Sequence, residues 1–149
     1  MFSVPHTTTK EVMDRLLHIQ NHPRYEDVSI KTFMESTHFI HRRYHFTYTK
    51  DAFRWIPSFL LPKDFRRVQN DSYFDFDQNE VRFCVQPSKE KYYRVEGHVV
   101  LQQRDKDVLL RVDIDSAEFQ YTPRWLQDRV SKFIVQQILQ DLESMAYLK

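Results

Sequence analysis

The C-terminal segment, residues 122–149, constrains the fold of this chain more than any other part of the sequence. It reads TPRWLQDRVSKFIVQQILQDLESMAYLK, contains no glycine, and has one proline, Pro123, directly after Thr122. Threonine is a good N-cap and proline is favoured at the first helical position, so we expect a helix to begin here. From Pro123 to Leu148 this helix would be about 39 Å long at a rise of about 1.5 Å per residue.

The predicted helix carries a long apolar stripe. Apolar residues recur along it at spacings of three and four, with polar residues elsewhere. The stripe consists of Leu126, Val130, Phe133, Ile134, Ile138, Leu142 and Met145. Such a stripe has to be buried against an apolar surface of similar length, which the rest of the chain must provide.

The middle of the chain predicts that surface. From residue 28 onward apolar and polar residues alternate, as is typical of β-strands. The expected strands are SIKTFMES and HFIHRRYHFTYT, followed by a meander of RRVQNDSYFDFD, EVRFCVQ, KYYRVEGHVVLQQ and VLLRVDIDSAEFQY. One face of the meander is apolar and the other charged, as in an antiparallel sheet that is covered on one side. The apolar face consists of Val81, Phe83, Val85, Val95, Val99, Leu101, Leu110, Val112 and Ile114.

The N-terminal residues predict a strand and a short helix. MFSV can form a strand, and Thr8 to Glu11 is a capping-box pattern that opens an apolar series running to Pro23. At 149 residues, the chain has the size of one domain, which we assign to residues 1–149. We therefore predict an α+β fold: a strongly curved antiparallel sheet of six to seven strands wrapped around the long C-terminal helix, with a short helix after the first strand.

Composition excludes several classes of function. The net charge of +1 and the isoelectric point of about 7.9 lack the basic character that nucleic-acid binding normally needs, so we expect no nucleic-acid partner. The single cysteine, Cys84, cannot form an internal disulfide, and the N-terminus has neither the basic nor the apolar region of a signal peptide. These features predict a cytoplasmic location.

The apolar residues of sheet and helix predict the walls of a cavity, because a bent sheet is held away from the helix in its middle. The predicted lining is Phe33, Arg42, Tyr44, Phe46, Tyr48, Phe74, Phe83, Val95, Val99, Leu110, Val112, Val130, Phe133 and Ile134. The hydroxyls of Tyr44 and Tyr48 would orient the polar end of a ligand, and Arg42 would pair with a carboxylate or escape at the sheet edge. The alternative is a filled core, which the pattern alone does not distinguish from a cavity.

The segment FRWIPSFLLP is apolar where a connection would normally be polar. We expect Trp55, Ile56, Phe59 and Leu60 to form a lid over the cavity, which could make transient contact with a membrane surface. The alternative is a plug that closes the end of the core.

The ionisable residues predict neither a metal site nor a catalytic one. His41 and His45 share a strand face but would lie about 13 Å apart at about 3.3 Å per residue, too far for one ion. Asp113 and Asp115 alternate with apolar neighbours and so fall on the solvent face, where we do not expect them to act as an acid and base pair. We expect no metal, no cofactor and no catalytic residue.

The order of elements resembles the START-like superfamily, also called SRPBCC or helix-grip, and most closely an uncharacterised bacterial branch of it. The resemblance spans nearly the whole chain. It rests on WIPSFLLPKDFRRVQNDSYFDFDQNEVRF, YYRVEGHVVLQQ and TPRWLQDRVSKFIVQQILQDLESMA. Members include lipid and sterol carriers, plant-hormone receptors and polyketide cyclases, and they share an apolar pocket between sheet and C-terminal helix. This chain departs from them in having one glycine, Gly97, where related proteins usually have several in their turns and lid loops.

The pattern and the resemblance together predict binding of a hydrophobic small molecule or lipid in that cavity, for transport or sensing. One alternative is an enzyme of the polyketide cyclase or hydratase kind that uses the same pocket. Another is a protein-interaction module with a filled core. The sequence favours binding over catalysis because it places few ionisable groups in the cavity, and it assigns no oligomeric state.

Overall fold

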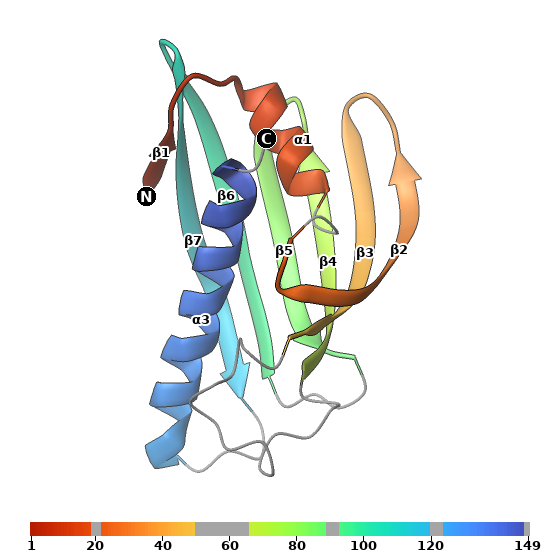
Figure 1. Cartoon of the computed structure of the whole chain (residues 1–149), viewed down its shortest axis with the longest axis vertical. Helices are drawn as coiled ribbons and strands as arrows, with labels where there is room; N and C mark the ends of the chain where they lie inside the picture. Colours follow the sequence, from red (N-terminus) through yellow and green to blue (C-terminus); the bar gives the residue numbers. More distant parts are fainter. Residues whose placement is uncertain (19–21, 50–65, 89–92, 120–123, 148–149) are drawn as a thin grey trace.

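The computed structural model describes residues 1–18, 22–49, 66–88, 93–119 and 124–147 of the chain (Figure 1). In the last range it describes the backbone throughout, and the side chains of Lys132 and of residues 135–147. Within the described part of the chain, no helix combines the length and the apolar character that crossing a bilayer requires.

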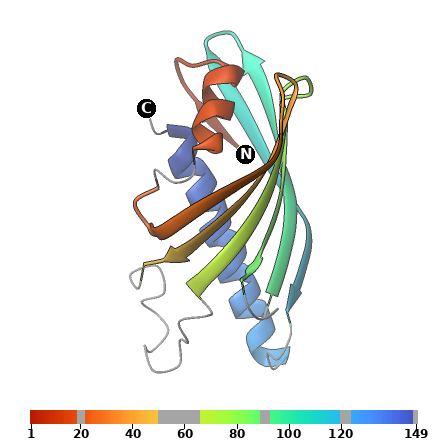
Figure 2. The ribbon, with the colours of Figure 1, turned by 90° about the vertical axis from the view of Figure 1, so that its right-hand side faces the viewer.

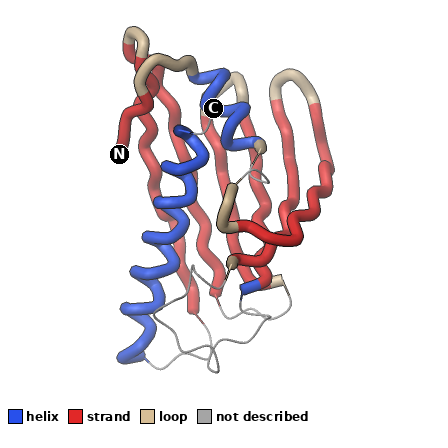
Figure 3. The backbone as a smooth tube through the Cα atoms, viewed as in Figure 1, coloured by secondary structure: helices blue, strands red, loops and turns tan. Residues whose placement is uncertain are grey.

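Seven strands form one antiparallel sheet. They are β1 (Phe2–Val4), β2 (Tyr25–Glu35), β3 (Phe39–Tyr48), β4 (Arg67–Asp75), β5 (Glu80–Pro87), β6 (Tyr93–Arg104) and β7 (Asp107–Phe119). Their order across the sheet is β1-β7-β6-β5-β4-β3-β2, so β2 to β7 form one continuous meander and β1 adds to its far edge (Figures 1 and 3). The predicted four-stranded meander is confirmed and extends to six strands.

Two helices, α1 (Thr9–Leu17) and α3 (Arg124–Tyr147), lie on the same side of the sheet (Figures 1 and 2). The curved sheet wraps around that side, and α3 runs along it with its C-terminal end beside α1. Arg15 of α1 ties the two helices together, because its Nη1 donates to the carbonyl oxygen of Ala146 at 2.8 Å. The predicted α+β helix-grip architecture is confirmed.

Helix α1 begins as predicted but ends earlier. Thr8 is its N-cap, and the Thr8 side chain accepts a hydrogen bond from the backbone nitrogen of Glu11 at 3.2 Å. The predicted extension to Pro23 is wrong, because His18 leaves helical geometry and caps the C-terminal end. The hydroxyl of Tyr44 donates to the carbonyl oxygen of Leu17 at 2.6 Å, which satisfies one of the acceptors that the helix end leaves open.

The core lies between the sheet and the helices. The apolar positions predicted for β5 and β6 are buried, and so is Leu110 of β7, whereas Val112 and Ile114 are partly buried. From α3, Ile138 and Met145 are buried, and Leu142 packs against them. The three described residues of the predicted helical stripe are therefore on the buried side of α3.

Candidate functional site

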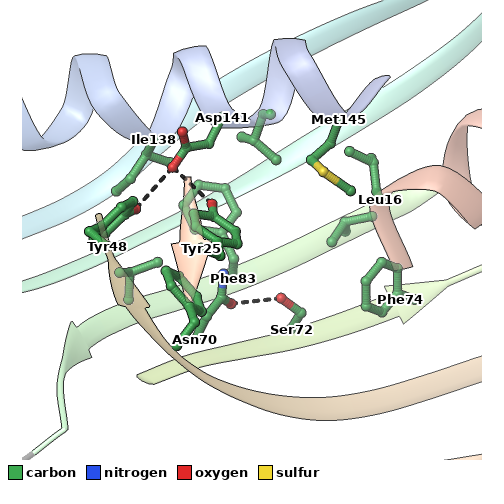
Figure 4. Close-up of a pocket in the computed structure, with 14 residues that line it drawn as sticks. Leu16, Tyr25, Tyr48, Asn70, Ser72, Phe74, Phe83, Ile138, Asp141 and Met145 are labelled. Atoms are coloured by element: carbon green, nitrogen blue, oxygen red, sulfur yellow. Dashed lines mark hydrogen bonds between the residues drawn. The ribbon is translucent and has the colours of Figure 1, made fainter. Parts of the chain in front are cut away.

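A small pocket lies between the inner face of the sheet and the two helices (Figure 4). The volume of this pocket is about 40 Å³. The lining residues are Leu16, Tyr25, Phe46, Tyr48, Asn70, Ser72, Phe74, Val81, Phe83, Val85, Ile138, Asp141, Leu142 and Met145. Most of them are apolar, so the polar side chains among them stand out as the groups that could orient a ligand.

A buried carboxylate, Asp141 of α3, is the centre of the polar part. Its Oδ2 accepts hydrogen bonds from the hydroxyls of Tyr25 at 2.8 Å and Tyr48 at 2.9 Å, and its Oδ1 accepts one from Nε2 of Gln137 at 3.1 Å. Figure 4 shows both tyrosines pointing at this carboxylate. Asp141 is 5% exposed. We call Asp141, Tyr25, Tyr48, Gln137 and the neighbouring His22 the Asp141 cluster.

Two features of the backbone assemble this cluster. Tyr25 begins β2 and Tyr48 ends β3, and the antiparallel register pairs them directly, so both hydroxyls reach the same oxygen. Gln137 and Asp141 are four residues apart on α3, which places them on the same helix face.

His22 completes the cluster as a neutral group. Its Nδ1 accepts a hydrogen bond from the backbone nitrogen of Arg24 at 3.1 Å, so the neutral ring carries its proton on Nε2. That Nε2 lies 3.5 Å from Oδ1 of Asp141 and is buried without a hydrogen-bond partner. Burial lowers the pKa of His22 below its usual value, against the opposing effect of Asp141 and with a smaller contribution from Arg24.

Burial also changes the pKa values of the acidic groups in the cluster. It raises the pKa of Asp141, while His22 and the hydrogen bonds from Tyr25, Tyr48 and Gln137 act in the opposite direction. It raises the pKa values of Tyr25 and Tyr48 well above their usual range, so both hydroxyls stay protonated and act as donors. Three neutral donors around one carboxylate suit its ionised form.

A second polar pair lies on the sheet side of the pocket. The hydroxyl of Ser72 donates to Oδ1 of Asn70 at 2.7 Å, and both residues belong to β4 (Figure 4). They interrupt the apolar inner face at the strand that crosses the middle of the pocket.

In the structure, only some of the predicted cavity residues line the pocket. Phe46, Tyr48, Phe74 and Phe83 line the pocket. Tyr44, Val95, Val99 and Leu110 are fully or almost fully buried in the core outside the lining, and Val112 is partly buried there. The side chains of Val130, Phe133 and Ile134 and the predicted lid residues Trp55, Ile56, Phe59 and Leu60 lie outside the described residues.

The placement of Phe33 differs from the prediction. Phe33 is 45% exposed on the outer face of the sheet, where its ring stacks on His41 at 4.8 Å between centroids. The cause is a register shift between Glu26 and Ser29, which changes the alternation of β2. Tyr25, before the shift, faces the pocket, whereas Phe33, an even number of residues later, faces outward.

Arg42 also differs, since it does not line the pocket. Its Nη2 lies 3.6 Å from Oε1 of Glu35, and its Nε is buried without a hydrogen-bond partner. The expected anchor for a ligand carboxylate is therefore engaged at the edge of the sheet. In its place the pocket contains a carboxylate of its own, Asp141.

Of the polar groups of the pocket, Tyr48 was predicted from the sequence, whereas Asp141, Tyr25, Asn70 and Ser72 were missed. For Asp141 the sequence did contain one signal. Asp141 lies three residues after Ile138 and four before Met145, so it falls within the apolar stripe of the C-terminal helix. A charged residue at such a position is either paired or functional.

The outer face of the sheet carries charged pairs around His98. Asp113 and Asp115 lie there as predicted, but His98 contacts both, with Nε2 3.3 Å from Oδ2 of Asp113 and Nδ1 2.9 Å from Oδ2 of Asp115. Among the described residues, no three histidine, cysteine, aspartate or glutamate side chains are grouped so that they could hold a metal ion.

Comparisons with known proteins give structural relatives only. No family model matches the sequence, and neither does any curated protein. Similar solved structures include TTHA0849 from Thermus thermophilus, with a TM-score of 0.56, 15% identity, and coverage of 97% of this chain and 92% of that one. The 18 kDa protein CC1736 from Caulobacter crescentus has a TM-score of 0.58 and 12% identity, with coverage of 97% and 91%.

A third similar structure is the ZhuI aromatase/cyclase from Streptomyces sp. R1128, with a TM-score of 0.55, 11% identity, and coverage of 97% of this chain and 88% of that one. These likenesses extend over almost the entire chain at very low identity, so they bear on the fold and not on the activity. Together with the seven-stranded curved sheet and its two helices, they show that this chain has the helix-grip fold.

Proposed function

We propose that the protein binds a small, mainly apolar molecule in the pocket between the sheet and α3, with a hydrogen-bonding group of the ligand directed at the Asp141 cluster. The observation that carries this proposal is a carboxylate buried in a pocket whose walls are otherwise largely apolar. Pockets for small molecules combine such walls with a few polar groups that fix orientation. The helix-grip fold, with its structural relative among aromatase/cyclases, supports the same reading.

The size of the pocket limits the ligand. A volume of about 40 Å³ holds a few water molecules and not an acyl chain. A larger ligand has to displace side chains, and Leu16 and Met145, which meet where α1 approaches α3, are the candidates. Methionine is unbranched and adapts its shape readily, so this side of the pocket can widen with little strain.

The proposal is tested by titrating methyl-labelled protein with 1-butanol and following its NMR spectrum. We expect saturable shifts of the Leu16, Ile138 and Met145 methyl signals, because these side chains line the pocket. Val81→Phe, which fills the pocket from β5, is expected to abolish the shifts. Tyr73→Phe, on the outer face of the neighbouring strand, is the matched control and should leave them unchanged. Shifts that do not saturate, or that persist in Val81→Phe, would contradict binding at this pocket.

A second candidate function, an enzyme acting on a 3-oxo compound, is favoured by the ionisable groups that converge on the pocket. The Asp141 carboxylate would remove a proton from the CH₂ between two carbonyl groups, and the negative charge would pass to the enolate oxygen. A tyrosine hydroxyl, from Tyr25 or Tyr48, would then donate to that oxygen. Burial raises the pKa of Asp141, which makes it a stronger base than an exposed aspartate.

Deuterium exchange at C2 of a 3-oxo ester, followed by NMR, tests this candidate. The enzyme reading predicts exchange that is faster than with Asp141→Asn protein. Equal rates with both proteins would exclude it and leave the binding proposal unaffected.

A further inference from the structure

If the binding proposal above is correct, the charges of the Asp141 cluster indicate which charge the ligand should carry. Among the described residues, the one side chain within 4.0 Å of the Asp141 carboxylate that can become cationic is His22. Its other partners, Tyr25, Tyr48 and Gln137, are neutral donors.

His22 does not supply the missing positive charge. Its Nδ1 accepts a hydrogen bond from the backbone N–H of Arg24. A proton on Nδ1 would replace this hydrogen bond by a repulsive contact between two N–H donors. The cluster thus combines one carboxylate with neutral groups.

The arginines near the pocket do not neutralise the carboxylate either. Arg42 pairs with Glu35, and Nη1 of Arg66 donates to the backbone carbonyl oxygen of Tyr48 at 3.0 Å. Arg24 is exposed to solvent. Among the side chains that the structure describes, none that is cationic therefore lies beside this carboxylate, and the low dielectric of the interior strengthens the effect of its charge on a ligand.

Among the described residues, Oδ1 of Asp141 also has fewer hydrogen-bond donors than Oδ2. Oδ2 accepts two hydrogen bonds, but Oδ1 accepts one, from Gln137. The Nε2–H of His22 approaches Oδ1 to 3.5 Å without forming a hydrogen bond. A carboxylate oxygen has room for two donors, so a ligand N–H could take the second place.

Aromatic rings add a second attraction for a cation. Tyr25, Phe46 and Tyr48 border the pocket beside Asp141, with ring centroids 3.9 Å apart for Tyr25 and Phe46 and 5.2 Å apart for Phe46 and Tyr48. Tyr25 is stacked between His22, 4.4 Å away, and Phe46, which leaves Phe46 and Tyr48 as the rings that could offer a face to an ammonium group.

We propose that the pocket selects a small apolar amine, bound as its ammonium ion with the nitrogen at Asp141, and that it rejects carboxylates. The sequence left two roles open for Arg42, pairing with a ligand carboxylate or escaping at the sheet edge, and the structure pairs it with Glu35. With Asp141 as the charged group of the pocket, the ligand should carry a positive charge.

The test compares three ligands that differ only in their polar group: butylamine, 1-butanol and butyrate. Dissociation constants are measured by NMR titration of the Leu16, Ile138 and Met145 methyl signals at neutral pH. We expect butylamine to bind about tenfold more tightly than 1-butanol, because it forms a charge-assisted hydrogen bond, and butyrate not to bind.

Asp141→Asn keeps an acceptor oxygen but removes the charge, and it should bring butylamine down to the affinity of 1-butanol. Asp113→Asn removes a carboxylate from the outer face and is the matched control for net charge. Wild-type protein gives an independent readout if Asp141→Asn does not fold: butylamine should lower the pKa of the Asp141 carboxyl measured by carbon-13 NMR.

The outcomes separate the two proposals. If butyrate or 1-butanol binds as tightly as butylamine, the amine proposal is overturned while small-molecule binding stands. If the preference survives in Asp141→Asn, the amine is recognised by another group and the proposal is likewise overturned. If none of the three ligands shifts the pocket methyls, the binding function fails and the amine proposal fails with it.

Discussion

Phe83 and Gly97 lie opposite each other on β5 and β6, and the Phe83 ring fills the space that a side chain at Gly97 would need. A Cβ atom at Gly97 would lie 2.6 Å from Cζ of Phe83 and 2.6 Å from the backbone oxygen of Asp113. The register of β6 and β7 also shifts between Glu96 and Gly97. The one glycine of the chain is thus required by close approach at an irregular point of the sheet.

Gly97→Ala should therefore destabilise the protein. The added methyl group meets both a pocket-lining ring and a backbone atom, and overpacking of this kind costs about 1–3 kcal/mol. Urea unfolding followed by circular dichroism measures the effect. Adding Phe83→Leu should recover part of the loss, because it removes one of the two clashes; equal midpoints for Gly97→Ala and wild type would contradict the packing described above.

The regular elements of this fold were predictable because each follows one simple period. The alternation in β5 and β6 and the stripe of α3 place Val81, Val95 and Ile138 correctly, since a covered sheet face and an amphipathic helix leave these residues no other favourable side. The short helix was predictable at its start, where Thr8 provides the cap, and not at its end.

The polar part of the pocket was less predictable because its residues break these periods. The register of β2 shifts next to Asp27, which has a φ of 51°. Because of this shift Tyr25 and Phe33 lie on opposite faces of the sheet, and no residue pattern nearby predicts it. Asp141 is a polar residue in an apolar stripe, so periodicity alone gives it no role. Its function as the centre of a cluster depends on Tyr25 and Tyr48, which are distant in sequence and become visible only through the fold.

Removing the Asp141 side chain should cost more than removing one of its donors. Asp141→Ala removes the acceptor of the hydrogen bonds from Tyr25, Tyr48 and Gln137, and because a lost buried hydrogen bond costs about 1–3 kcal/mol, we expect a loss of several kcal/mol. Tyr48→Phe removes one donor and should cost about 1 kcal/mol. Free energies of unfolding from urea denaturation test the order of the two variants. A smaller loss for Asp141→Ala than for Tyr48→Phe would show that the cluster is not assembled around the carboxylate.

His22 should make the protein less stable in acid. Its pKa is lower in the folded state than the usual value of 6.5, so the unfolded chain binds the proton more readily. The stability that the neutral ring contributes is fully present above pH 6.5 and is lost as the pH falls from there through the folded pKa. Unfolding free energies measured across this range should fall for wild type and fall less steeply for His22→Gln.

The matched control for the pH experiment is His38→Gln. His38 is exposed and its pKa is raised, mainly by its hydrogen bond to Asp77, so its contribution has the opposite sign. An identical pH dependence in wild type and His22→Gln would contradict a buried neutral His22. Titration of the His22 ring signals by NMR gives the same answer without any mutation.

Asparagine and aspartate replace glycine at several turns of this chain, which explains how it folds with one glycine. Positive φ angles occur at His6, Asp27, Asn79 and Asp105 among the described residues, and asparagine and aspartate tolerate this conformation better than most residues. Asn79, with a φ of 51°, precedes β5 and accepts a hydrogen bond at its backbone oxygen from the nitrogen of Leu101 at 2.9 Å. Its conformation is therefore held by a neighbouring strand.

Asn79→Ala should destabilise the protein by about 1 kcal/mol, because alanine adopts positive φ at a cost of this size, whereas Asn79→Gly should be close to neutral. Thermal unfolding of both variants measures the difference. The comparison isolates the backbone, since both substitutions remove the same side-chain amide. If Asn79→Gly is as unstable as Asn79→Ala, the asparagine amide and not its backbone conformation stabilises the turn.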